Sequence, residues 1–371
     1  MKTLKRRTFL RRAVGVGAGL SYFALHPDQI WEANAAFAAD AAEEAKKAKL
    51  AKYTFTFSSP YITSRHVTTP HAHLEIKRLI EAYTKNKVHV IIHEGGIDGT
   101  GSALSNRVRY GKSQGALLSV ANLVPLVSEL DVLNIPFWSS SKSEYVRLFK
   151  SQAWDKHVLS KTAKHKLKVL FPYVVGARTA TSTRKYGKLI KSPADFEGVK
   201  FRIPGSKSLA VFYKLTKAKP LKFAWNLTAR TARIGRFQAL DPSVIGLYSG
   251  PDNLREELGI ISEIESVHDG WVAIGNTDFI ASLDSETRTQ FMDSMAEIQT
   301  EQVKLYRNSR GFCIEEFAKL GTKTYIPTPK ERELLASSFG HSNPAWTPVK
   351  KRLLGEDGVT VFDKLFKVAK G

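Results

Sequence analysis

Arg202 is the residue whose type and setting point most directly to chemistry. It lies in the apolar segment Val199–Pro204, where a buried guanidinium needs a partner because an unpaired buried charge is costly. A guanidinium presents a planar fork that matches a carboxylate through two parallel hydrogen bonds. The partner is therefore either the carboxylate of a bound ligand or an Asp or Glu of the protein, and the segment alone leaves both open.

Three other groupings could do chemistry but have simpler explanations. His71 and Glu75 are four residues apart and would share a helix face, so they could hold a metal, although a solvated helix face explains them better. His268 and Asp269 follow a predicted strand, where packing or capping is favoured over a catalytic dyad. Cys313, flanked by apolar residues, is expected to be a core thiol rather than a nucleophile.

No sequence motif for enzymatic chemistry stands in its required context downstream of the N-terminal segment. Residues 39–371 contain no HExxH, no P-loop, and no GxGxxG after a predicted strand, and their one GxSxG, at 111–115, precedes a predicted strand instead of following one. The glycine-rich run 15–19 follows no strand and lies in the segment discussed next. We therefore expect a protein that is not an enzyme and that holds no metal and no cofactor.

Residues 1–38 have the order of features of a twin-arginine signal peptide. The basic stretch Lys5–Arg11 contains the paired arginines and is followed by the weakly apolar run Ala13–Leu25 and by small residues up to Ala38. The alternative is a basic amphipathic tail that binds a membrane or nucleic acid. The order of the features favours export to the periplasm and cleavage near Ala38, which would leave residues 39–371 as the mature protein.

The composition is that of a globular protein with a strong positive charge. Of 371 residues, 43% are hydrophobic, and the single cysteine excludes an internal disulfide framework. No run of 18 apolar residues exists, so no spanning helix is predicted. The net charge is +21; six basic and two acidic residues fall in 1–38, which leaves +17. This charge could steer anionic solutes, bind an anionic surface or have no partner. Export argues against nucleic acid.

Hydrophobic periodicity alternates between strand and helix along the mature chain. This alternation predicts layered α/β domains. Strands are expected at 53–57, 88–92, 116–120, 167–175, 199–203, 220–223, 239–245 and 262–267, and helices at 69–85, 102–110, 206–216 and 225–237.

A helical pattern of almost forty residues, from Asp284 to Leu320, follows these units. It is long for one compact domain and is expected to lie across two lobes, with a possible kink at Arg310–Gly311. Several short helices follow to the C-terminus. We predict a first lobe of about 52–174 plus a returning segment near 262–283, and a second lobe of about 175–261 plus the C-terminal helices.

The stretch Leu189–Gly205, with sequence LIKSPADFEGVKFRIPG, resembles the signature of the DctP family. These are periplasmic solute-binding proteins of tripartite ATP-independent periplasmic (TRAP) transporters. Three more stretches agree with that family in the expected order, and the resemblance covers about residues 52–355. They are Gly176–Arg178, Trp225–Pro242, and Gly111–Val120 with Leu130–Phe137 after it.

The resemblance implies a set of ligand-binding residues. Arg202 matches the arginine that clamps the ligand carboxylate, and Arg178 matches a second, supporting arginine. The remaining positions are a ligand-facing residue of the first lobe, a polar group of the second lobe, and two wall residues: Ser119, Asp241, Trp225 and Tyr248. Arg230, Arg233 and Arg236 are expected on a solvated helix face.

The chain departs from the family pattern at two positions. Leu227 and Gln238 stand where the family often has acidic residues. Some members hold a metal with the ligand through such groups, so their loss argues against a bound cation. Asp241 is an acid at an anion site, and it needs a ligand hydroxyl or amine, or one of Arg178 and Arg202, as its partner.

The resemblance implies a two-lobed periplasmic-binding-protein fold of α/β class, with hinge strands between the lobes. The expected function is capture of a small organic acid and delivery to the small and large subunits of a TRAP membrane permease, by a monomer that binds no nucleic acid. A ligand-binding sensor for a membrane receptor and, less favoured, an exported enzyme are the alternatives. Which carboxylate is bound stays open.

Overall fold

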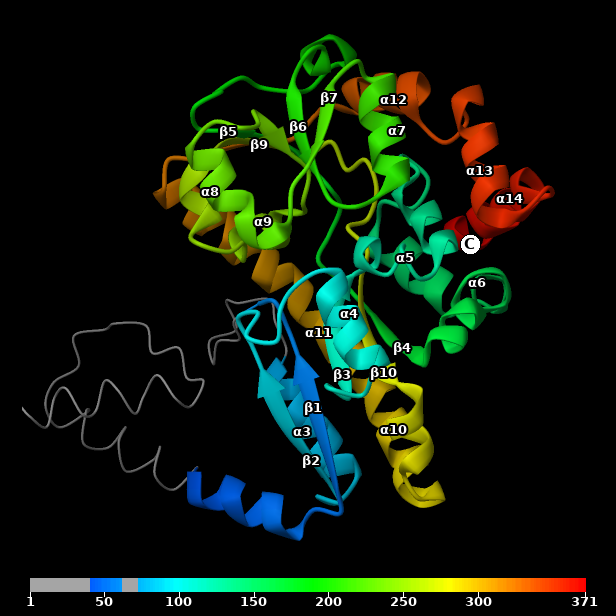
Figure 1. Cartoon of the computed structure of the whole chain (residues 1–371). Helices are drawn as coiled ribbons and strands as arrows, with labels where there is room; N and C mark the ends of the chain where they lie inside the picture. Colours follow the sequence, from blue (N-terminus) through cyan, green and yellow to red (C-terminus); the bar gives the residue numbers. More distant parts are fainter. Residues whose placement is uncertain (1–40, 62–72) are drawn as a thin grey trace, which may run out of the picture.

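The computed structural model describes residues 41–61 and 73–371. The predicted signal peptide (1–38) and His71 lie outside these residues. The chain forms two lobes, each built on its own β-sheet, and Figure 1 shows one lobe above the other with a long helix beside both. The two-lobed α/β architecture expected from the sequence is confirmed. Within the described ranges, no helix is long and apolar enough to cross a membrane.

The first lobe contains a five-stranded sheet of order β2-β1-β3-β10-β4. Most of this sheet comes from the first half of the chain, but β10 returns after the second lobe and pairs antiparallel with β3 and β4. The middle of the sheet is buried, since β3 and β10 have no exposed residue. The strands are β1 (Tyr53–Ser58), β2 (Val88–His93), β3 (Gly115–Ser119), β4 (Leu167–Tyr173) and β10 (Trp271–Asn276).

The second lobe contains a six-stranded sheet of order β11-β9-β5-β8-β6-β7. β6 pairs parallel with both β7 and β8, whereas β5 pairs antiparallel with β8 and β9. The strands are β5 (Ala180–Thr183), β6 (Lys200–Ile203), β7 (Lys219–Lys222), β8 (Ala239–Leu240), β9 (Leu258–Ser262) and β11 (Lys323–Tyr325).

Helices cover both sheets, and several begin at the caps that their sequences predict. Ser141 and Glu144 form a capping box at α5, and Thr328 and Glu331 form one at α12. Residues 41–50 are also helical. The helices are α3 (His73–Tyr83), α4 (Ser102–Arg109), α5 (Lys142–Phe149), α6 (Gln152–His157), α7 (Lys207–Leu215), α8 (Thr228–Arg233), α9 (Val244–Tyr248), α10 (Thr277–Ser282), α11 (Ser285–Lys319), α12 (Pro329–Phe339), α13 (Thr347–Leu354) and α14 (Gly358–Lys370).

Short 3-10 helices connect these elements. Two of them flank the region where the lobes meet, η1 after β3 and η5 before α8. They are η1 (Val120–Asn122), η2 (Ser128–Asn134), η3 (Leu159–His165), η4 (Pro193–Phe196), η5 (Trp225–Leu227), η6 (Leu254–Glu257) and η7 (Pro344–Trp346).

Two of the predicted strands were wrong. The expected strand 239–245 ends at Leu240, because Ser243 caps α9 by accepting a hydrogen bond from the backbone N–H of Gly246 at 3.2 Å. The expected strand 262–267 is instead β9, which ends at Ser262. Residues 263–269 leave the sheet and pass to the other lobe. A local apolar pattern does not distinguish a strand from an extended crossing segment. The helix expected at 225–237 ends at Arg233.

Two crossing segments, 174–179 and 263–270, run side by side and join the two lobes. Ala177 and His268 form an antiparallel bridge, and the backbone N–H of Asp269 donates to the carbonyl of Gly176 at 2.8 Å. Gly176 has φ of +96°, and a Cβ there would lie 2.6 Å from the hydroxyl of Tyr306 on α11. Glycine is therefore required where the long helix passes under the crossing segments.

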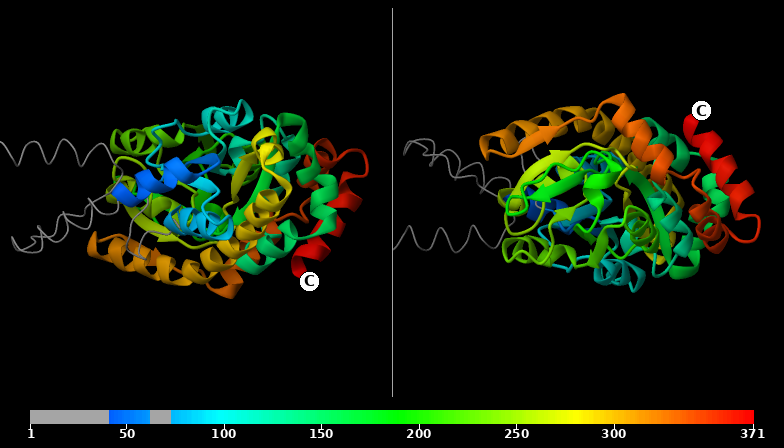
Figure 2. Two further views of the ribbon diagram at one scale, coloured as in Figure 1. Left: turned by 90° about the horizontal axis from the view of Figure 1, so that it is seen from below. Right: turned by 90° about the horizontal axis from the view of Figure 1, so that it is seen from above.

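α11 is one continuous 35-residue helix, which confirms the predicted long helix. Arg310 and Gly311, where a kink was considered, are helical like the residues on either side of them. The helix packs on α3 and β4 of the first lobe and on α9 and β11 of the second. Both views of Figure 2 show it along one side of the molecule. At its middle, the side chain of Gln302 bonds both backbone groups of Val174, at 2.7 and 2.9 Å.

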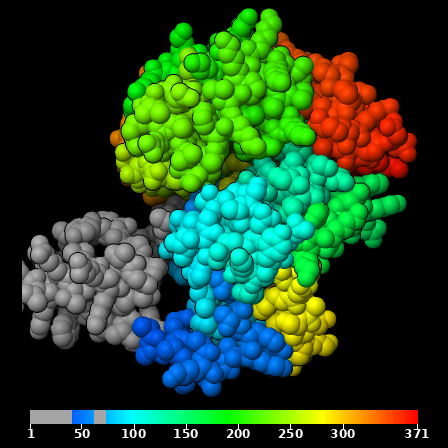
Figure 3. Space-filling model, in the orientation of Figure 1, coloured from blue at the N-terminus to red at the C-terminus, as the bar shows by residue number. Residues whose placement is uncertain are grey.

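The C-terminal helices extend over both lobes. α12 packs on η4 of the second lobe, whereas α13 packs on η2 and α14 packs on α5 and α6, which precede β4 in the chain. Figure 3 shows this C-terminal segment as the red flank beside the second lobe and the adjoining part of the first. The C-terminal helices, which we expected with the second lobe, thus also cover helices that belong to the first-lobe half of the chain.

Candidate functional site

Arg178 lies in the first crossing segment, where both lobes meet. Its backbone N–H donates to the carbonyl of Val267 at 2.7 Å. Its side chain is 3% exposed and makes two ion pairs, from Nη1 to Asp241 Oδ1 at 3.1 Å and from Nη2 to Asp269 Oδ1 at 2.8 Å. Asp269 Oδ2 accepts in turn from the backbone N–H of Ser243 at 3.2 Å. The Arg178 guanidinium is therefore held between two acidic residues of the protein.

Burial and ion pairing have opposite effects on the pKa values of Arg178 and Asp241. Burial lowers the pKa of Arg178, but Asp269 and Asp241 together raise it above its ordinary value. Burial raises the pKa of the Asp241 carboxyl, which Arg178 lowers only in part and which Asp269 raises further. Arg178 is thus shared between two carboxylates, and its effect on the pKa of Asp241 does not fully offset burial and the nearby Asp269.

Arg202 lies near the end of β6 and differs from Arg178 in its partners. Its side chain is buried, its guanidinium lies 5.1 Å from the ring centroid of Trp225, and Nη2 donates to the carbonyl of Phe223 at 2.9 Å. Within residues 41–61 and 73–371 it forms no ion pair, and its buried Nε has no hydrogen-bond partner. Burial lowers the pKa of Arg202 to about 10, against a smaller raising effect of Asp241.

Four more of the predicted site residues carry buried polar atoms for which no hydrogen bond is found in the described part of the chain. Two of these atoms, Arg178 Nε and Asp241 Oδ2, belong to the ion-paired group. The other two are Ser119 Oγ, at the end of β3, and Trp225 Nε1, at the start of η5. Ser119 is 7% exposed, and its register partner in the sheet is Trp271 of β10. Buried polar atoms are almost always hydrogen-bonded, so these two atoms are open to a bound polar molecule.

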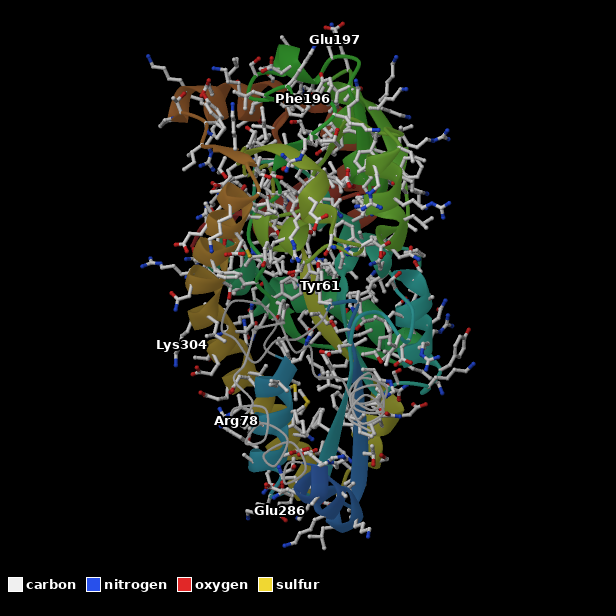
Figure 4. All side chains as sticks on the ribbon, turned by 90° about the vertical axis from the view of Figure 1, so that its left-hand side faces the viewer. Tyr61, Arg78, Phe196, Glu197, Glu286 and Lys304 are labelled. Atoms are coloured by element: carbon white, nitrogen blue, oxygen red, sulfur yellow. The ribbon has the colours of Figure 1, made fainter. Side chains whose placement is uncertain are left out.

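Tyr61 and Trp271 connect the first lobe to the arginines. Their rings lie 4.7 Å apart. Burial raises the pKa of Tyr61 well above its ordinary value, and Arg178 and Arg202 both act to lower it. Figure 4 shows Tyr61 midway between Phe196 at one end of the molecule and Glu286 at the other. The structure therefore brings Arg178, Arg202, Asp241, Trp225 and Ser119 to one region between the lobes.

Tyr248 is not part of this group. It lies in the last turn of α9 and packs against Phe312 and Phe317 of α11, with ring centroids 5.6 and 5.8 Å away. The guanidinium of Arg255 covers its ring at 4.9 Å. These contacts direct Tyr248 toward the long helix rather than toward Arg202.

Sequence analysis missed three residues of the group, and only one of them had a usable signal. Asp269 was considered only with His268, although an acid in a polar crossing segment is a natural partner for a buried arginine. Tyr61 and Tyr213 gave no signal, since buried tyrosines are ordinary core residues. Tyr213 stacks on Phe201 at 4.1 Å and lowers the pKa of Asp241 from the second-lobe side.

The titratable residues that sequence analysis set aside have structural roles. The ring of His268 stacks on Tyr145 at 4.1 Å, and burial lowers the pKa of His268 to about 3, so the ring is neutral near pH 7. Burial raises the pKa of the Cys313 thiol to about 12. The packing role predicted for His268 and the core position predicted for Cys313 are confirmed. Arg230, Arg233 and Arg236 are exposed, as predicted.

One group of side chains in the first lobe has the composition of a metal site, and it is separate from the two buried arginines. Atoms of Glu44, Glu81 and His89 lie within 4.8 Å of one another. The ammonium of Lys77 is hydrogen-bonded to Glu81 and lies 2.7 Å from Glu44 Oε2, and Lys47 lies 3.5 Å from Glu81. Because two lysines already neutralise these carboxylates, the group is an ion-pair network that joins residues 41–50 to α3.

Comparison with known families gives one match. Residues 59–235 match the model of the family described as bacterial extracellular solute-binding protein, family 7 (DctP). This confirms the family that the sequence resembles.

Solved structures with the same fold are TRAP periplasmic solute-binding proteins. One from Sulfurospirillum deleyianum, with bound succinate, has a TM-score of 0.73 and 17% identity, over 87% of this chain and 99% of the other. One from Anaerococcus prevotii, with bound glucuronate, has a TM-score of 0.75 and 15% identity, over 86% and 98%. A sugar-acid-binding protein from Advenella mimigardefordensis, in complex with galactonate, has a TM-score of 0.74 and 16% identity, over 85% and 97%.

Proposed function

Because the chain belongs, through residues 59–235, to family 7 of the bacterial extracellular solute-binding proteins, we propose that it captures a small organic acid between its lobes and delivers it to a TRAP membrane permease. The protein acts by binding and release, and the fold it shares is that of binding proteins. The family implies a periplasmic location.

The observation that carries this proposal is the buried guanidinium of Arg202. A buried cation without a protein carboxylate is unfavourable, and a ligand carboxylate removes that cost by pairing with it. Stacking on Trp225 holds the planar group in one orientation, which suits recognition of a carboxylate by two parallel bonds. Arg178 contributes by fixing Asp241 beside the site.

The ligands of proteins with this fold support an acid as the solute. The three structures described above hold succinate, glucuronate and galactonate, and all three ligands carry a carboxylate. Their identity to this chain is 17% or less, so the choice among acids depends on this chain's own residues.

Transport follows from a change in the balance between open and closed lobes. A ligand that contacts Arg202 of the second lobe and Ser119 of the first binds the closed form better than the open form, so it shifts the population toward the closed form. The closed form then docks on the small and large permease subunits. The positive charge of the mature chain raises the capture rate for anions.

A screen of the purified protein against small organic acids, amino acids, sugars and metal salts tests this function. A ligand at one hundred times its dissociation constant adds about 2.7 kcal/mol of stability, which thermal unfolding detects. We expect stabilisation by a group of chemically related carboxylates. Silence across the acids, or stabilisation only by metal salts, would contradict the proposal.

Export by the twin-arginine route is part of the proposal and has its own test. Substitution of Arg6→Lys together with Arg7→Lys is expected to keep the precursor in the cytoplasm, because the paired arginines are the export signal. Fractionation of cells followed by detection of the protein gives the result. A normal periplasmic yield from the double variant would exclude this route.

A further inference from the structure

The buried positive charges of the described chain are few enough to count. Three basic residues other than histidine are buried: Arg178, Arg202 and Lys350. Lys350 lies on α13, 4.0 Å from the ring centroid of Phe362 on α14, and so belongs to the C-terminal helices rather than to the region between the lobes. His268 is neutral near pH 7. Among the described residues, the guanidinium groups of Arg178 and Arg202 are therefore the buried cations near the junction of the lobes.

Only one of these two groups is available. Both terminal nitrogens of Arg178 are committed to Asp241 and Asp269, whereas Arg202 forms no ion pair with a described residue and only lies within the electrostatic influence of Asp241. The four buried groups, two arginines and two aspartates, carry no net charge when all are ionised. One ligand carboxylate can be paired at Arg202, and a second would enter the neighbourhood of Asp241, where the described residues supply no further buried cation.

We propose that the site selects hydroxy monocarboxylates, pairing one carboxylate with Arg202, and discriminates against dicarboxylates. This inference deepens the proposed function and rests on it. Two observations define the ligand: the single free guanidinium sets the number of carboxylates, and the open polar atoms around it set the rest of the molecule.

The polar atoms without partners call for hydroxyl groups. Asp241 accepts from Arg178 and interacts with the Tyr213 hydroxyl, and its carboxylate can accept a further bond from a ligand hydroxyl. Ser119 Oγ both donates and accepts, and Trp225 Nε1 only donates. A hydroxyl satisfies an acceptor and a donor in turn, whereas a second carboxylate only accepts and is repelled by Asp241.

Matched acids of equal carbon number test the selection. Gluconate and glucarate differ only in a terminal CH₂OH or carboxylate, and 4-hydroxybutyrate and succinate form a shorter pair of the same kind. In calorimetric titrations of the purified protein, we expect the monoacid of a pair to bind at least about tenfold more tightly than the diacid. Hexanoate, which has one carboxylate and no hydroxyl, is expected to bind more weakly than gluconate.

Two variants with the same change of charge show which carboxylate causes the preference for the monoacid. Asp241→Asn and Asp269→Asn each remove one carboxylate from Arg178, but both oxygens of Asp269 accept bonds from the protein. Asp241 also acts on Arg202 more strongly than Asp269 does. We expect Asp241→Asn to reduce the monoacid preference about tenfold or more, and Asp269→Asn to change it less.

The outcomes separate this inference from the function on which it rests. A diacid that binds as tightly as its hydroxy monoacid, or more tightly, overturns the inference and leaves carboxylate capture standing. If other acids bind and no hydroxy monoacid does, the inference is also overturned and carboxylate capture stands. Silence across the full acid panel overturns the proposed function and the inference together. The wild-type titrations decide these points even if a variant fails to fold.

Discussion

Arg178 of the first crossing segment and Arg202 of the second lobe are both buried arginines, yet their partners differ. Arg178 has two carboxylates within 3.1 Å, and Arg202 has a carbonyl and an aromatic face. A buried pair that is complete within the chain belongs to the fold, because removing one member leaves charge unpaired. A buried cation that the chain leaves unpaired is open to an anion from outside. The difference teaches that the partner, rather than the residue type, identifies the ligand site.

The largest expected effect comes from replacing Arg178 by a long apolar side chain. Arg178→Met leaves Asp241 and Asp269 buried without their cation, and we expect the free energy of unfolding to fall by about 3–5 kcal/mol. Urea denaturation of the ligand-free protein measures the loss. A fall of under about 1 kcal/mol would show that the two ion pairs do not hold the crossing segments.

The same replacement at Arg202 should produce the opposite pattern. Arg202→Met removes a buried cation that has no carboxylate, so the ligand-free protein should be as stable as the wild type or more so. Ligand binding should weaken about a hundredfold, which corresponds to about 3 kcal/mol, because the ligand carboxylate loses its partner. Calorimetry and urea denaturation of the same sample give both values. Unchanged affinity would remove Arg202 from the site.

Acid should weaken the crossing segments through His268, whereas the Arg202 guanidinium stays protonated throughout. The pKa of His268 is about 3 in the folded protein and about 6.5 in the unfolded chain. Between these values the unfolded chain binds one more proton, so stability falls as pH decreases, by about 1.4 kcal/mol per pH unit. His268→Phe retains a ring over Tyr145 and should remove this slope, as measured by denaturation from pH 7 to pH 4. An unchanged slope in the variant would assign the acid sensitivity to other groups.

The smallest effect is expected at an exposed arginine of the same lobe. Arg233 pairs with Glu257 at 2.8 Å, but its side chain is 51% exposed. Arg233→Ala should change the free energy of unfolding by less than about 1 kcal/mol and leave ligand affinity unaltered. It is the control for the loss of one positive charge. A loss of affinity like that of Arg202→Met would indicate that overall charge, rather than a specific pair, drives binding.

Much of the fold could be predicted because its signals are local. The apolar runs of β3 and β6 and the continuous pattern of α11 lie within single segments, and their boundaries agree with the structure to within a few residues. The strand expected at 262–267 failed because an extended crossing segment has the same local pattern as a strand. Only the neighbouring backbone, here that of residues 174–179, decides between them.

The site was only partly predictable, since its decisive feature is non-local. Arg178 and Arg202 both follow from the resemblance, but nothing in their segments shows that Arg178 is paired and Arg202 is not. The partners of Arg178 lie 63 residues away at Asp241 and further along the chain at Asp269. Tyr248 was expected to line the ligand site because the resemblance implies a wall residue there. In the folded chain it packs α9 against α11 instead.

The long helix α11 acts mechanically as a flexure between the lobes. At 1.5 Å per residue its 35 residues span about 52 Å, and its two ends are packed on opposite lobes. Gln302 and Arg310, near its middle, are bonded to Val174 and Glu263 of the two crossing segments. A rotation of one lobe against the other must therefore curve this beam, and the elastic work of curving it becomes one component of the affinity for any solute.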